Sequence, residues 1–168
     1  MLTSIILLIS IILDGILTNY LPYLVNDLSL FTPLLTVVSI FILYPLNRKK
    51  ETKFFILMFI VGIIYDLLYT NLLFLNGLLF VLIAFISKII YKNFETSYFK
   101  LIIYTILIIV IYESLYAGIL FIYRVVPITI YKLFYKISHT LILNIIYTEL
   151  LYFIIKHLPK KYKRISIN

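Results

Sequence analysis

Four acidic residues lie inside otherwise apolar stretches of this chain: Asp14, Asp66, Glu113 and Glu149. A carboxylate in the bilayer core costs roughly 2.5–3.5 kcal/mol on insertion scales, so the folded state must compensate it. Such residues serve either chemistry, as a proton relay, ion site or ligand pocket, or structure, as polar contacts between helices. We expect all four to face the interior of a helix bundle, near donors such as Arg124, His139, Asn144 or tyrosine hydroxyls.

Asp66 has the most distinctive surroundings. Its stretch is bounded by Gly62 and Gly77, two of only four glycines in the chain. Intramembrane aspartyl proteases carry a Tyr-Asp pair, here Tyr65-Asp66, and a Gly-x-Gly-Asp on a second helix, because two carboxylates must share one proton to activate water. The sequence contains no Gly-x-Gly-Asp. We therefore expect no catalytic residue, and we expect Asp66→Asn to be mild because an amide keeps hydrogen bonds.

The sequence contains few residues that could bind a metal ion or a cofactor. The chain has no cysteine and two histidines, His139 and His157. They lie on one expected helix, about 27 Å apart at ~1.5 Å per residue, so they cannot share a metal ion. The sequence predicts no metal site and no cofactor.

The composition is that of an integral membrane protein. Hydrophobic residues make up 64% of the 168 residues and the mean hydropathy is +1.12, whereas soluble domains are roughly 45–50% apolar. Polar connections are too short for a nucleotide-binding or DNA-binding domain, so we expect one transmembrane domain over residues 1–168. The net charge of +8 lies in short clusters beside apolar stretches, which indicates membrane topology rather than nucleic-acid binding.

The apolar stretches predict an all-α bundle of six transmembrane helices. They cover about residues 2–21, 29–46, 54–69, 77–91, 101–123 and 138–158. The first lacks a preceding positive charge and an Ala-x-Ala site, so we expect a retained helix rather than a signal peptide. Pro22 is expected to end it, Pro33 to lie in the first turn of the second helix, and residues 128–137 to form a short interfacial helix. Ser114 and Gly118 share one face of the fifth, where a neighbouring helix could approach closely.

Basic residues predict the orientation. Twelve of the fifteen flank the loops after the second and fourth stretches and the C-terminus, and the positive-inside rule makes that side cytoplasmic. We expect a multi-pass protein of the bacterial inner or plasma membrane with both termini cytoplasmic. The C-terminal cluster is expected to lie on anionic lipid, with a cytoplasmic protein partner as the alternative; its bases are Lys160, Lys161, Lys163 and Arg164.

The third and fourth stretches carry a resemblance to a known family. Gly62, Asp66 and the following Leu67-Leu68 form a Gly-x-x-x-Asp-Leu-Leu, and the small residue Gly77 opens the next stretch after a short turn. This pattern resembles MreD, the rod shape-determining membrane protein of the bacterial elongation machinery.

Two further segments resemble MreD motifs. Asn144 matches a late asparagine of the last helix. Asn26-Asp27-Leu28 stands where the family has a Pro-Asp-Leu-like start to the second helix, although the proline is missing. The resemblance covers essentially the whole chain. It implies that Asp66, Gly62 and Asn76 act through packing and local structure near the outer surface.

The resemblance implies a non-enzymatic scaffold for cell shape. MreD-like proteins pair with the bitopic protein MreC and sit with MreB, RodA and its class B transpeptidase, which together direct peptidoglycan synthesis in the elongasome. Homodimerisation stays open. The family fold is similar to that of the substrate-binding S-components of energy-coupling-factor vitamin transporters, which gives the alternative function. Against it, an Ala-x-x-x-Ala docking motif is absent, since Ala84 and Ala117 are the only alanines.

Overall fold

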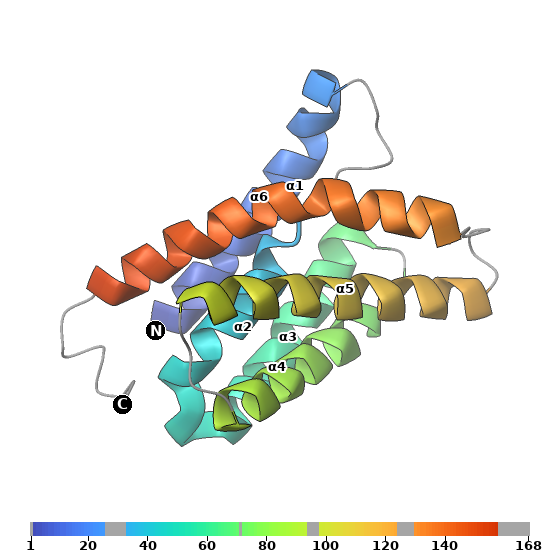
Figure 1. Cartoon of the computed structure of the whole chain (residues 1–168). Helices are drawn as coiled ribbons and strands as arrows, with labels where there is room; N and C mark the ends of the chain where they lie inside the picture. The colour runs from blue at the N-terminus through green and yellow to red at the C-terminus, as the bar shows by residue number, and fades with distance from the viewer. Residues whose placement is uncertain (1, 26–32, 71, 94–97, 124–129, 158–168) are drawn as a thin grey trace.

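The computed structural model describes the chain except residues 1, 26–32, 71, 94–97, 124–129 and 158–168. Within the described part the fold is all-α (Figure 1). Its helices are α1 (Leu2–Val25), α2 (Leu35–Asn47), α3 (Glu51–Tyr69), α4 (Leu75–Asn93), α5 (Tyr98–Ile122) and α6 (Ile130–His157), with a short 3₁₀ turn, η1 (Arg48–Lys50), between α2 and α3.

Among the described residues, five helical stretches are long and apolar enough to cross a membrane. They are Leu2–Tyr20, Leu35–Tyr69, Leu75–Lys92, Tyr98–Ile122 and Leu133–His157. The difference from the six expected spans lies in α2 and α3, which η1 joins without a break so that they count as one stretch. With 13 residues, α2 alone is shorter than the roughly 17 needed for a membrane-spanning helix.

Three expected helix boundaries are wrong. Helix α1 continues through Pro22 to Val25, since a proline is tolerated in a membrane helix whose freed backbone groups find other partners. Helix α2 begins at Leu35, after Pro33 rather than around it. The expected interfacial helix and the last span form one continuous helix, α6.

Helix α2 is the centre of the bundle. All ten residues from Leu35 to Tyr44 are buried, and the helix contacts α1, α4, α5 and α6. A helix that is apolar on every side lies either in a protein core or in a membrane, and the burial of α2 places it in the core of the bundle. Figure 1 shows α5 passing in front of α2, α6 passing in front of α1, and α3 and α4 below them.

Apolar side chains also cover the outside of the bundle. On α1 and α6 they recur at helical spacing, as in Leu8, Ile12 and Ile16 and again in Ile142, Ile146 and Phe153, all exposed. This outer surface suits lipid, which is as apolar as the side chains themselves.

Candidate functional site

Asp66 joins the end of α3 to the start of α4. Its carboxylate accepts hydrogen bonds from the Asn76 backbone N–H (2.9 Å) and side-chain amide (2.7 Å), and from the Thr70 hydroxyl (2.9 Å). The Gly77 N–H lies 3.4 Å from the same carboxylate. The first N–H groups of a helix have no partner within it, so Asp66, which is fully buried, acts as the N-terminal cap of α4.

Gly62 lets the two helices come this close. A Cβ atom at this position would lie 2.5 Å from the Asn76 carbonyl oxygen and from the Gly77 Cα. Such small residues allow close backbone approach between membrane helices. The Asn76 side-chain oxygen also accepts a 2.6 Å hydrogen bond from the Tyr112 hydroxyl, which ties this corner to α5.

Asp14 caps the start of α2, as Asp66 caps the start of α4. Its carboxylate accepts the Leu35 N–H (2.8 Å), the Thr36 N–H (3.0 Å) and the Thr36 hydroxyl (2.6 Å). Asn144 of α6 accepts the preceding Leu34 N–H at 3.1 Å. The central helix therefore begins between two polar side chains, one from α1 and one from α6.

Glu113 connects α5 to α6. Its carboxylate pairs with the Lys136 ammonium at 2.9 Å, and the same ammonium lies 5.7 Å from the centre of the Tyr116 ring. Glu113 is buried, whereas a quarter of the Lys136 side chain is exposed. In each of the helix pairs α1–α2, α3–α4 and α5–α6, a buried acid of the first helix thus binds the second.

The predicted intramembrane polar residues differ in burial. It buries Asp66, Gly62, Asp14, Glu113 and Asn144. The prediction that Glu149 faces the interior is wrong: it is exposed on α6, where it interacts with the Tyr98 side chain.

Several other predicted residues lie outside the part of the chain that the structure describes. These are Asp27, the donor candidate Arg124 and the basic cluster Lys160, Lys161, Lys163 and Arg164. Of the remaining donor candidates, His139 contacts the Tyr135 carbonyl oxygen of its own helix at 2.9 Å.

Sequence reasoning missed several of the residues that make these contacts. It did not assign Thr70, Thr36 or Tyr112, and it placed Lys136 on a separate interfacial helix. The Thr70 contact carries a local signal, since Asp66 and Thr70 are four residues apart, the spacing of neighbours on a helix. The others depend on how distant helices pack, which periodicity does not reveal.

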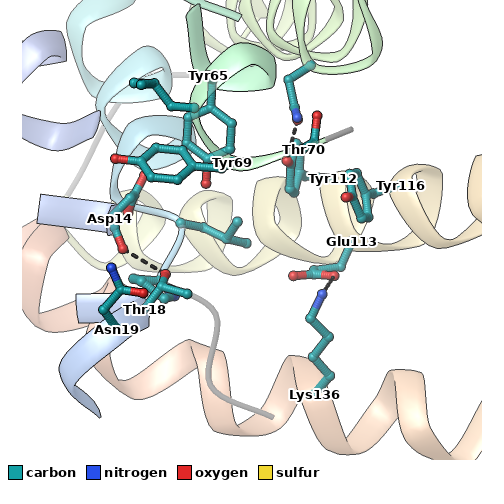
Figure 2. Close-up of a pocket in the computed structure, with 14 residues that line it drawn as sticks. Asp14, Thr18, Asn19, Tyr65, Tyr69, Thr70, Tyr112, Glu113, Tyr116 and Lys136 are labelled. Carbon is teal, nitrogen blue, oxygen red and sulfur yellow. Dashed lines mark hydrogen bonds and ion pairs between the residues drawn. The ribbon is translucent and has the colours of Figure 1, made fainter. Parts of the chain in front are cut away.

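A cavity of about 430 Å³ lies beside these contacts. Figure 2 shows the side chains that surround this cavity. They include Asp14 of α1, tyrosines of α3 and α5, Glu113 of α5 and Lys136 of α6. The four lining tyrosines are Tyr65, Tyr69, Tyr112 and Tyr116. Among the described residues, every buried side-chain nitrogen or oxygen has a hydrogen-bond partner, so the polar interior is closed by the chain's own contacts.

The family model described as rod shape-determining protein MreD matches residues 1–162 of the chain. The chain belongs to the MreD family. Membership implies a role in rod shape determination, a multi-pass membrane protein and no catalysis. No curated protein and no solved structure matches the chain. In an MreD-family chain the buried acids therefore need no reaction to explain them, and their contacts at helix starts give them a structural role.

Proposed function

We propose that the chain is a non-catalytic scaffold subunit of the rod-shape complex that binds an MreC-like bitopic protein and helps to position the peptidoglycan synthesis machinery. The main support for this proposal is the match of the MreD family model to residues 1–162. RodA, its class B transpeptidase and MreB are the further partners that the family suggests. We also propose one transmembrane domain over residues 1–168, with both termini cytoplasmic.

The interior contacts support a scaffold because they fix the helices relative to one another. Asp66 attaches the end of α3 to the start of α4, and Asp14 attaches the middle of α1 to the start of α2. The buried polar groups of the described residues are satisfied. A rigid surface loses little conformational freedom when a partner binds. The contacts thus favour a fixed outer surface rather than a mobile reaction centre.

Helix α5 offers a place where a partner's transmembrane helix could approach closely. Ser114 and Gly118 are both exposed, and no atom of the described residues lies within 4 Å of a Cβ built at Gly118. Helix pairs in membranes favour such small residues at their contacts. Among the described residues nothing packs against Gly118, so this is the first face to test.

The test is affinity purification of the tagged protein from its native membrane in mild detergent, followed by mass spectrometry. We expect to recover an MreC-like bitopic protein, with RodA and its transpeptidase in lower yield. Gly118→Leu should reduce that recovery at unchanged protein level, whereas Ile60→Phe, at an exposed position of α3, should not. Absence of any MreC-like protein would contradict the scaffold function.

The second candidate function is a substrate-binding S-component of an energy-coupling-factor transporter. The 430 Å³ cavity favours it, because small-molecule sites have volumes of roughly 300–1,000 Å³. The same purification separates the two functions. Recovery of a coupling membrane subunit with two ATPases, in place of an MreC-like protein, would establish the transporter.

A further inference from the structure

In the Glu113–Lys136 pair, residues that line the cavity bind a positive charge, the ammonium group of Lys136. The ammonium lies between a buried carboxylate at 2.9 Å and the face of the Tyr116 ring, whose centre is 5.7 Å away. A carboxylate combined with an aromatic face is a common recognition site for ammonium groups in proteins. Glu113 and Lys136 both line the 430 Å³ cavity, so this ion pair faces open space.

Lys136 is the replaceable member of this pair. Glu113 is held in the interior with 2% of its side chain exposed, whereas 25% of the Lys136 side chain is exposed. A lysine can withdraw its head group toward water while its flexible stem stays on the protein. The ammonium position beside Glu113 could then be taken by another cation without moving a helix.

The charges of the described lining residues favour a cation over an anion. They include two carboxylates, Asp14 and Glu113, and one ammonium, Lys136. The helix start of α2 offsets part of the Asp14 charge. An anion would have to compete with Glu113 for Lys136, and it would also meet the negative faces of the tyrosine rings.

We propose that this cavity binds a small ligand through an ammonium group, which displaces Lys136 from Glu113 and lies against Tyr116. The ligand is either a free amine or the ethanolamine head group of a lipid, since both carry the same ammonium. An ammonium site is independent of the scaffold function, because none of the contacts that it uses lies on the outer surface. Failure to recover an MreC-like protein would leave it unchanged.

Chemical rescue of a lysine variant tests the site directly. Lys136→Ala in full-length protein removes the Lys136 ammonium from its place beside Glu113, and the melting temperature should fall by a few degrees. Propylammonium chloride should restore it in a concentration-dependent manner, as expected for a ligand that binds only the folded state. The uncharged isostere 1-propanol should not, and the double variant Glu113→Gln/Lys136→Ala should show no rescue. Equal effects of the amine and the alcohol, or none, would overturn the proposal.

The wild-type protein provides a second test that needs no variant. Tetramethylammonium chloride should displace Lys136 and increase its rate of acetylation by an amine-reactive reagent several-fold, measured by mass spectrometry. The rate at the exposed Lys100 should stay the same, and sodium chloride at equal ionic strength should have no effect. An unchanged Lys136 rate would overturn the proposal for the wild-type chain.

The source of the ammonium follows from the lipid in which the rescue is measured. In nanodiscs of phosphatidylglycerol alone, propylammonium should rescue Lys136→Ala fully. If ethanolamine head groups occupy the site, nanodiscs containing phosphatidylethanolamine should raise the melting temperature of Lys136→Ala without added amine. If the natural ligand is a free amine, the two kinds of nanodisc should give the same rescue curve.

Discussion

The Asp66 carboxylate on α3 accepts both the backbone N–H and the side-chain amide of Asn76 on α4, at 2.9 and 2.7 Å. One buried acid thus satisfies the first free donors of the next helix and fixes the angle between the two. Thr70 adds a third donor to the same carboxylate at 2.9 Å. A network in which every buried polar group is satisfied is rigid, and the loss of one acceptor leaves a donor unpaired.

Asp66→Asn is expected to destabilise the protein, contrary to the expectation from sequence alone. Donors approach both carboxylate oxygens, so an amide would point its own NH₂ group at an N–H. An unsatisfied buried donor costs about 1–3 kcal/mol, which should lower the melting temperature and the amount of protein in the membrane. Thermal unfolding in mild detergent measures this.

Glu149→Gln is the matched control for Asp66→Asn. It makes the same change of acid to amide, but at an exposed position of α6. Its melting temperature should stay close to that of the wild type. Equal effects of the two variants would show that the Asp66 contacts do not stabilise the fold.

Gly62→Ala should also destabilise the α3–α4 corner. The added methyl group would lie 2.5 Å from the Asn76 carbonyl oxygen and the Gly77 Cα, and backbone atoms cannot yield as a side chain can. Overpacking of this kind costs typically about 1–3 kcal/mol. Gly118→Ala adds the same methyl group where no atom of the described part of the chain lies within 4 Å, so it should be neutral or stabilising. A Gly62→Ala protein as stable as Gly118→Ala would contradict the close approach.

The sequence predicts the α3–α4 corner well because two local signals coincide there. Asp66 is costly in an apolar stretch unless it is paired, and Gly62 lies four residues earlier on the same helix face. Both are buried in the structure and contact the residues that open α4. A charged residue and a glycine at helical spacing thus located the contact, although the donors themselves could not be named.

Glu149 shows where counting acids in apolar stretches fails. Among the described side chains of α6, the buried polar ones are Thr140, Asn144 and Thr148, which recur every four residues and share one face. Glu149 is one position beyond Thr148, about 100° around the helix, so it points away from that face. The periodicity of α6 contained this information, whereas the hydrophobicity of the stretch did not.

The partners of Asp14 and Lys136 could not be read from the sequence. Asp14 binds N–H groups of Leu35 and Thr36, which follow it by 21 and 22 residues. Lys136 binds Glu113, 23 residues before it. Each pairing depends on where a helix begins and on how two helices are offset along their axes, and the expected boundaries were wrong at α2 and α6.

Removal of Asp14 should loosen the start of the central helix. In Asp14→Ala the N–H groups of Leu35 and Thr36 lose their acceptor. Loss of a cap costs roughly 1 kcal/mol, which corresponds to about a fivefold increase in hydrogen exchange at these two amides. Exchange at Phe41, in the buried middle of α2, should be unchanged. A uniform increase along α2 would indicate global destabilisation instead of a lost cap.

Two single-cysteine variants test the proposed orientation, since the chain has no cysteine of its own. Lys49 lies in η1 and Leu73 in the turn before α4, and both are exposed. The excess of basic residues on the Lys49 side makes that side cytoplasmic. In intact cells or spheroplasts a membrane-impermeant maleimide should therefore label Leu73→Cys and spare Lys49→Cys, and permeabilised cells should show both labelled. Labelling of Lys49→Cys before permeabilisation would reverse the orientation and place the α3–α4 corner on the cytoplasmic side.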